Sequence, residues 1–217
     1  NRSLATYLGR FVPAGKRRWL DEWQHMSLDG YTKLERARRW PDNATTRMLT
    51  AASLLRLARD DASLAAQKFD ALDGHFKWEE TRRADLLWNI ALYSAVAMDQ
   101  DTNARMLRVP VNYRDSKLLE WWARFLLNTQ AWQEVAKVIE QMPEETRNDD
   151  RWRYWLAQAG LRSGQVKPPS PLLQTLANKA NYYGFMAADE LGLGYNICPG
   201  KADISADALQ RVAGLDG

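Results

Sequence analysis

The sequence has few of the residues from which metal centres and disulfide frameworks are built. Its 217 residues include a single cysteine, Cys198, which excludes an internal disulfide framework and a thiolate-built metal cluster. The two histidines, His25 and His75, lie far apart in the chain, which argues against a histidine-rich metal site. No apolar run approaches the roughly 20 residues that a membrane-spanning helix needs. We therefore expect no metal, no cofactor and no transmembrane segment.

Strand-like alternation is also lacking, whereas apolar residues recur at helical spacing almost everywhere. In residues 135–142, for example, apolar side chains fall at helical intervals and charged or amide side chains lie between them. Each such stretch predicts a helix with one buried face. Gly164 and Gly192 stand where left-handed C-terminal caps are expected, and Asn43 is suited to an N-cap.

The predicted helices repeat as pairs, which determines the expected fold. Longer helices open at intervals of 35, 36 and 34 residues, near Thr46, Thr81, Lys117 and Arg151. Each is followed by a shorter helix, at about 62–72, 100–108, 131–142 and 171–179. A two-helix unit that recurs at about 34 residues is typical of an α-solenoid. We predict an all-α fold, a right-handed α-superhelix of stacked two-helix repeats, TPR-like without the TPR consensus. An irregular start, with helices at about 3–11 and 16–27, would cap it.

The positive charge is concentrated near the N-terminus. Residues 1–40 hold nine Lys or Arg against four Asp or Glu, whereas the whole chain has a net charge of only +3. Such a segment could attract an acidic partner, for example a nucleic acid, an anionic lipid or an anionic cell-wall polymer. The alternative is that these cations only keep the exposed faces of helices in contact with water.

No arrangement of residues predicts catalysis. Glu79 and Glu80 are adjacent, so on a helix they point about 100° apart, and they suit the first turn of that helix. Glu144 and Glu145 follow Pro143 and are interpreted as solvated loop residues. For His75 the neighbouring sequence supplies no orienting partner for a general base. Phosphate-binding loops, nucleophile elbows and zinc-protease helices are absent from the sequence, and we assign no catalytic residue.

Tryptophan is unusually frequent, with ten residues. Helical spacing favours a core position for Trp122, Trp152 and Trp155, because large rigid rings fill the gaps between stacked helices. Trp121 is the best candidate for an exposed face, where an aromatic ring could stack on the apolar face of a sugar.

Two motifs carry a resemblance to a known family. Residues 150–155 read Asp-Arg-Trp-Arg-Tyr-Trp, and residues 181–189 read Asn-Tyr-Tyr-Gly-Phe-Met-Ala-Ala-Asp. This pair is similar to the end of the helical U-domain of soluble lytic murein transglycosylases from Gram-negative bacteria, and the run 10–23 is also similar to that family. The resemblance covers most of residues 5–198.

The resemblance implies a periplasmic enzyme that cleaves the β-1,4 bond between N-acetylmuramic acid and N-acetylglucosamine and leaves a 1,6-anhydro sugar. It also implies a ring formed by the superhelical domain, a linker domain and a lysozyme-like catalytic domain. The family's catalytic glutamate lies in a Glu-Ser pair, which does not occur in these 217 residues. We therefore expect a U-type domain over residues 1–198, the start of the linker at 199–217, and no activity from this chain alone.

The leading hypothesis is a non-catalytic scaffold that guides peptidoglycan strands or muropeptides to the catalytic domain of the full-length protein. Its expected location is the periplasm, without a signal peptide in this chain, because Asn1-Arg2-Ser3 is not an apolar leader. Alternatives are a stand-alone solenoid adaptor for other cell-wall proteins and a helical-repeat RNA binder, against which the resemblance argues. The candidate substrate-binding residues are Lys16, Arg17, Arg18, Trp121, Tyr182 and Tyr183.

Overall fold

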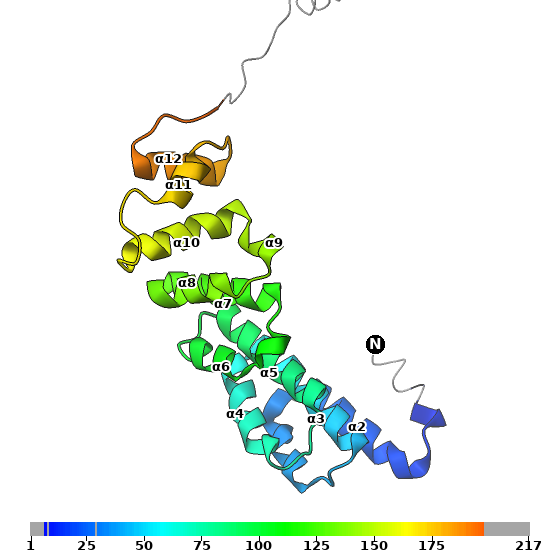
Figure 1. Cartoon of the computed structure of the whole chain (residues 1–217). Coiled ribbons are helices and arrows are strands. Elements are labelled where there is room, and N and C mark those ends of the chain that lie inside the picture. Colours follow the sequence, from blue (N-terminus) through cyan, green and yellow to red (C-terminus); the bar gives the residue numbers. More distant parts are fainter. Residues whose placement is uncertain (1–6, 8, 29, 198–217) are drawn as a thin grey trace, which may run out of the picture. The chain divides into compact units, whose positions relative to one another are not determined.

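The computed structural model describes residues 7, 9–28 and 30–197, without the side chains of residues 16, 23–28 and 30–33. It divides the chain into two compact units, Asn1–Ala131 and Trp132–Gly217. Across the described ranges all regular structure is helical (Figure 1). Within them, no helix combines the length and the apolar character that crossing a membrane requires.

The first unit consists of longer and shorter helices in alternation. The longer ones are α2 (Ala14–Leu28), α3 (Ala44–Asp60), α5 (Glu80–Val96) and α7 (Ser116–Asn128). The shorter ones are α4 (Ala62–Asp73) and α6 (Thr102–Arg108). Three 3-10 segments accompany them, η1 (Gly9–Phe11), η2 (Gly30–Arg39) and η3 (Val111–Tyr113).

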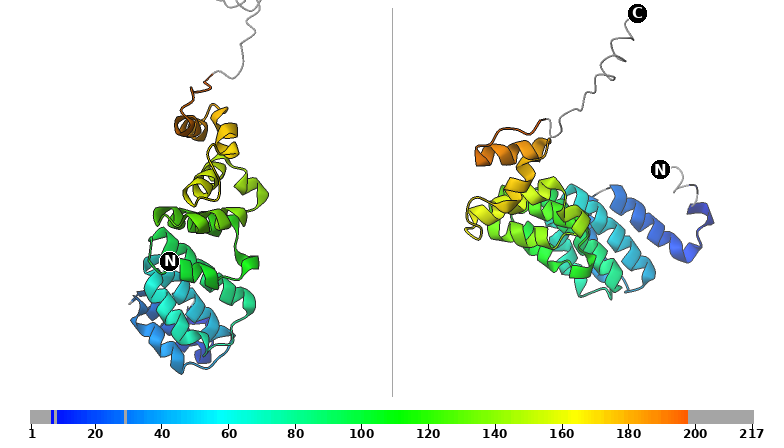
Figure 2. Two further views of the ribbon diagram at one scale, coloured as in Figure 1. Left: turned by 60° about the vertical axis from the view of Figure 1, so that its left-hand side comes forward. Right: turned by 45° about the horizontal axis from the view of Figure 1, so that its top comes forward.

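Helices in the first unit pack on both their nearest and their next-nearest neighbours along the chain. Thus α5 contacts α3, α4, α6 and α7, and the cyan and green helices lie side by side in both views of Figure 2. The core between them is apolar and includes the fully buried side chains of Leu54, Leu57, Phe69 and Leu86. This pattern of contacts is the one that stacked helix pairs produce.

The second unit is built around one central helix. It comprises α8 (Trp132–Glu140), α9 (Glu144–Arg147), α10 (Asp150–Arg162), α11 (Pro171–Ala177) and α12 (Tyr182–Leu191), and α10 contacts each of the other four. Trp152, Leu173 and Leu176 are completely or almost completely buried there. The expected all-α fold of paired helices is confirmed in both units.

Local sequence explains where these helices begin and end. Asn43 and Thr46 form a capping box at α3, and the side chains of Asp61, Asp115 and Asn181 accept hydrogen bonds from the first turns of α4, α7 and α12. Glycines with positive φ follow α10 and α12, Gly164 at +74° and Gly192 at +65°. The predicted N-cap and both predicted left-handed glycines are confirmed.

The predicted repeat is confirmed, and three short elements were missed: α9, η2 and the 3-10 turn η3. The long helices α3, α5, α7 and α10 begin at residues 44, 80, 116 and 150, within two residues of the prediction. Glu144 and Glu145 were predicted in a loop. They open the short helix α9 instead, because Pro143 is preset for a helix start and two carboxylates suit its positive end.

The longest of the missed elements is the ten-residue 3-10 helix η2. Its buried side chains, Leu34, Ala37 and then Trp40, recur every third residue, which matches the three residues per turn of a 3-10 helix. At the start of the chain, 9–11 is a 3-10 turn and α2 covers the predicted helix at 16–27. The rest of the predicted helix at 3–11, apart from Tyr7, and the predicted linker at 199–217 lie outside the described residues.

Candidate functional site

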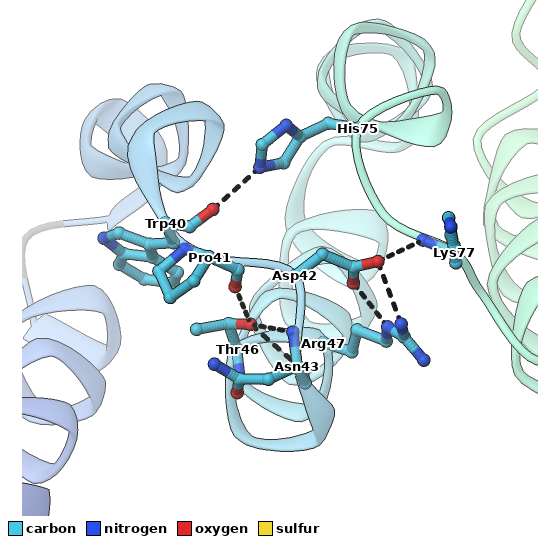
Figure 3. Close-up of polar contacts among 8 residues, drawn as sticks. All are labelled: Trp40, Pro41, Asp42, Asn43, Thr46, Arg47, His75 and Lys77. Atoms are coloured by element: carbon cyan, nitrogen blue, oxygen red, sulfur yellow. Dashed lines mark hydrogen bonds and ion pairs between the residues drawn. The ribbon is translucent and has the colours of Figure 1, made fainter.

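The groups considered for catalysis are not assembled into a site. Glu79, Glu80 and Glu144 are exposed at the starts of α5 and α9. The ring Nε2 of His75 lies 2.9 Å from the carbonyl oxygen of Trp40, which can only accept, so Nε2–H is the donor (Figure 3). The described part of the chain holds no group of three His, Cys, Asp or Glu side chains that could bind a metal, and Cys198 lies outside it.

The contact of His75 belongs to a polar junction at the start of α3. The carboxylate of Asp42 accepts hydrogen bonds from the Arg47 guanidinium at 2.5 and 2.9 Å and from the backbone N–H of Lys77 at 3.1 Å (Figure 3). The bonds from Arg47 hold the pKa of Asp42 below its ordinary value. The contacts of His75 with Trp40 and of Lys77 with Asp42 each join residues 35 positions apart, which spacing along the sequence could not reveal. They fix the turn before α3 against the loop before α5.

The predicted basic residues on α2 are only partly placed. Arg17 and Arg18 are exposed, and the side chain of Lys16 lies outside the described residues. The Nε of Arg17 donates to the carbonyl oxygen of Val12 at 3.3 Å, and the Arg18 guanidinium lies 5.2 Å from the centre of the Trp19 ring. Both contacts are local, within α2 and the turn before it.

The two adjacent tryptophans of α7 differ in burial as their helical positions predict. Trp122 is 4% exposed, and its indole N–H donates to the Asn103 side chain at 2.9 Å. Trp121 is half-buried, with the Arg124 guanidinium 5.1 Å from its ring centre. Trp152 is buried and Trp155 is partly buried, packed against the core of the second unit. Trp121 is thus less exposed than a free stacking platform.

The two predicted tyrosines lie together at the start of α12. Tyr182 is 67% exposed, and its ring meets that of Tyr183 edge to face, with centres 5.1 Å apart. Tyr183 in turn lies against the buried Tyr154 of α10, at 5.9 Å between ring centres. Of the two, Tyr182 has the aromatic face that a ligand could reach. Tyr183 packs between it and the core.

The two sequence motifs of the second unit contact one another. Asp150, which opens α10, accepts hydrogen bonds from Lys179 Nζ at 2.6 Å and from the Asn181 side-chain amide at 2.8 Å. Asn181 also caps α12 through its other side-chain atom, since its oxygen accepts from the Gly184 N–H at 2.9 Å. Burial acts to raise the pKa of Asp150, but the bonds from Lys179 and Asn181 outweigh it and the pKa is lowered.

A second contact joins the first motif to Glu190, the residue that directly follows the second motif, through the hydroxyl of Tyr154. This hydroxyl donates to the Glu190 carboxylate at 3.4 Å and accepts from the Gln158 amide at 3.2 Å. Burial, and then the negative charge of Glu190, raise the pKa of Tyr154 to about 12. Tyr154 is therefore neutral at physiological pH and acts as a fixed structural donor.

Gly184 explains why the second motif contains a glycine. A Cβ at this position would lie 2.1 Å from the carbonyl oxygen of Lys179 and 2.9 Å from that of Leu176. Both atoms belong to the backbone, so they cannot rotate away. Only glycine allows α12 to approach the end of α11 this closely.

A basic groove that was not predicted as a site lies between η2 and α4 in the first unit. It has a volume of about 510 Å³ and is lined by Leu34, Glu35, Arg38, Arg39, Gln67, Lys68, Ala71 and Leu72. Three of these side chains are cationic and one is anionic. The available clue was the run of arginines at 36–39, which had been noted only as part of the charge excess of residues 1–40.

These features define a helical-repeat protein of the α-solenoid class. Its described surface carries exposed cationic and aromatic side chains. The motif residues of the second unit hold helices together and do not form a reaction centre. No family model matches the chain.

Curated relatives have one name in common. The soluble lytic murein transglycosylase of Escherichia coli K12 is 24% identical over 210 residues, which cover 96% of this chain and 32% of that protein. The enzyme of the same name from Salmonella typhimurium is 24% identical over 141 residues, 64% of this chain and 17% of that protein. The chain spans about a third of the length of the Escherichia coli relative that it matches.

Solved structures agree with the curated relatives. An inactive mutant of the lytic transglycosylase Slt from Pseudomonas aeruginosa matches 98% of this chain and 34% of its own, with a TM-score of 0.76 and 26% identity. The 70 kDa soluble lytic transglycosylase of Escherichia coli matches 89% of this chain and 31% of its own, at a TM-score of 0.66 and 23% identity. The resemblance to soluble lytic murein transglycosylases is therefore confirmed over almost the whole chain, and so is the fold class.

Proposed function

We propose that this chain is the non-catalytic α-solenoid part of a peptidoglycan lytic transglycosylase. The observation that carries the proposal is the similarity to such enzymes along 96% of this chain but only 32% of the relative's length. The contacts between the two motifs support the proposal, because the roles of Asp150, Asn181 and Gly184 are structural: they position helices α10 and α12. In this proposal the solenoid comprises residues 1–198 and a linker begins at 199.

The proposed role of the solenoid is to bind and guide peptidoglycan. Glycan strands or muropeptides are its partners, together with the catalytic domain of the full-length protein, which cleaves the N-acetylmuramic acid linkage to 1,6-anhydromuropeptides. Other cell-wall proteins are further partners, nucleic acids are not, and the location is the periplasm. The basic surface of the first unit supports this role, because the peptide stems of peptidoglycan carry carboxylates.

The test uses the chain itself and purified peptidoglycan sacculi. The chain is mixed with sacculi, the sacculi are pelleted, and bound protein and released muropeptides are measured, the latter by mass spectrometry. We expect protein in the pellet and no anhydromuropeptides, while the Escherichia coli enzyme, as a positive control, releases them. Anhydromuropeptides from this chain alone would contradict a non-catalytic role. Pelleting no greater than that of serum albumin would contradict guiding and favour the adaptor alternative.

A further inference from the structure

The basic groove between η2 and α4 is lined by three cationic side chains and one described carboxylate, so it carries a net positive charge. Lys68 forms an ion pair with Glu35, whose carboxylate is 71% exposed. The hydrogen bond and charge of Lys68, with a smaller contribution from Arg38, hold the pKa of Glu35 below its ordinary value. Glu35 is therefore ionised at neutral pH, but among the described residues that line the groove it is the only carboxylate.

The two arginines of the groove retain free donor groups. Arg38 is fixed by its Nε, which donates to the Ala71 carbonyl oxygen at 3.1 Å, and its terminal NH₂ groups make no hydrogen bond or ion pair within the described residues. Arg39 is exposed and makes neither a hydrogen bond nor an ion pair there. A guanidinium presents a planar pair of donors that matches a carboxylate.

The floor of the groove is apolar. Leu34 and Leu72 are 1% and 2% exposed, and Ala71 lies beside them. The volume of about 510 Å³ is in the range of small-ligand sites. Cations at the rim and aliphatic side chains below suit a ligand that has both carboxylates and methyl or methylene groups.

We propose that this groove is a subsite for the carboxylate-bearing peptide stems of peptidoglycan, with Arg38 and Arg39 as the anion-binding residues. This inference rests on the proposed function and names the part of the ligand that the solenoid recognises. The alanine methyl groups of a stem face Ala71, which is the exposed part of the aliphatic floor, and its carboxylates face the two guanidinium groups. Gln67 lies at the same groove and can exchange hydrogen bonds with a peptide group.

Glu35 has a definite place in this arrangement. Its carboxylate forms with Lys68 the ion pair that a bound stem carboxylate could otherwise form. Its negative charge also repels any second anion in the groove. Removing that charge frees Lys68 and should strengthen binding. Opposite effects from Arg39 and Glu35 variants distinguish a binding site from a region that merely supports the fold.

The experiment measures binding of a soluble muropeptide, a disaccharide with a free peptide stem, by isothermal titration calorimetry at low salt. The variants are Arg39→Gln, Arg38→Gln with Arg39→Gln, and Glu35→Gln. The control carries Arg56→Gln and Arg59→Gln, two exposed arginines on α3. We expect about a threefold loss of affinity from the single arginine variant, about tenfold from the double variant, and about a threefold gain from Glu35→Gln. The control should bind as the unchanged chain does.

The same muropeptide with amidated stem carboxylates identifies the chemical group. It should bind the unchanged chain about tenfold more weakly than the free acid. Equal affinity for both forms, unaltered affinity in the single variant Arg39→Gln, or tighter binding of inorganic polyphosphate would each overturn the inference. In those cases unchanged pelleting with sacculi leaves the proposed function standing, whereas loss of pelleting by the unchanged chain removes both.

Discussion

Arg105 is the residue of the first unit whose replacement should cost the most stability among its arginines. It lies on α6 and is 7% exposed. Its guanidinium donates to the hydroxyl oxygens of Ser94 and Ser63 at 2.7 and 2.8 Å and to the carboxylates of Asp99 and Asp101 at 2.7 and 3.2 Å. These partners lie on α5, on α4 and in the turn before α6, so one side chain ties three helices together.

The substitution Arg105→Met keeps most of the apolar volume and removes all four bonds. It leaves the Asp99 carboxylate, 17% exposed, without its cation, while the Ser94 hydroxyl retains only its own donation to the Ile90 carbonyl at 2.8 Å. Removing one partner of a buried ion pair costs about 3–5 kcal/mol, since the remaining charge stays desolvated. Asp101 is 61% exposed and regains water, so its bond adds little. We expect a loss of about 3–4 kcal/mol.

The assay is urea unfolding at pH 7, followed by circular dichroism and by tryptophan fluorescence, with the exposed Arg56→Met as control. The control should change the free energy of unfolding by less than about 0.5 kcal/mol. Adding Asp99→Asn to Arg105→Met should cost less than the sum of the two single changes, by about 1–3 kcal/mol. A loss below about 1 kcal/mol for Arg105→Met, or strict additivity, would refute the idea that a buried charge network holds these helices.

Four further predictions concern single positions. Gly184→Ala should destabilise the second unit by about 2–3 kcal/mol in urea unfolding, because its Cβ would lie 2.1 Å from the Lys179 carbonyl oxygen. Gln130→Gly should stabilise the first unit by about 0.5–1 kcal/mol in urea unfolding, because glycine relieves the φ of +56° that follows α7. The lowered pKa of Asp150 stabilises the fold above about pH 4 and ceases to do so as the pH falls. Asp150→Asn should therefore cost about 1 kcal/mol at pH 7 and progressively less as the pH falls below about 4 in urea unfolding. Because the pKa of Tyr154 is raised to about 12, its stabilising effect is present below about pH 10 and lost as the pH rises through 12. Absorbance at 295 nm, which reports tyrosine ionisation, should show a titration step near pH 12 that Tyr154→Phe removes.

Each of these has a simple contrary outcome. An unchanged urea midpoint for Gly184→Ala would mean that α12 can shift without cost. A stability loss in Gln130→Gly would mean that chain entropy outweighs backbone strain. Equal losses for Asp150→Asn at pH 7 and pH 2 would exclude a role for its charge, and a Tyr154 step near pH 10 would show that its hydroxyl is solvated.

The sequence predicted most of the fold because the deciding interactions are local. Helix starts followed from cap residues and apolar spacing, and the ends of α10 and α12 followed from glycine. The ends of α5 and α7 contain the same left-handed turn, but Met98 and Gln130 adopt it, with φ of 53° and 56°. Methionine and glutamine seldom adopt a positive φ. Of the three described left-handed turns that end long helices, at residues 98, 130 and 164, only the one at Gly164 could therefore be predicted from the sequence. The 3-10 helix η2 was missed because its apolar residues recur every third position, which differs from the period of about 3.6 residues in an α-helix.

Less of the candidate site could be predicted from the sequence, because a groove between two elements depends on non-local packing. The arginines of residues 36–39 were noted as charge, but nothing in the sequence showed that Lys68 and Gln67 of α4 would lie beside them. Trp121 was correctly given the less buried position of its pair, yet Arg124 covers part of its ring. Tyr182 is well exposed as a candidate should be. The burial of a side chain can be predicted from the helical periodicity of the sequence. The neighbours of a surface residue cannot, because they come from other parts of the chain.

The residues that made the family recognisable differ from those that are proposed to bind. Asp150, Asn181 and Gly184 are fixed by geometry: a carboxylate between two donors, a cap, and a position where no Cβ fits. Such requirements follow from the fold whatever ligand it meets. Arg38 and Arg39 are exposed and line the groove, so we expect their substitution to leave the core intact. If the groove binds as proposed, specificity for a ligand can change there without disturbing the stacked helices, because the residues that recognise the ligand are not those that maintain the fold.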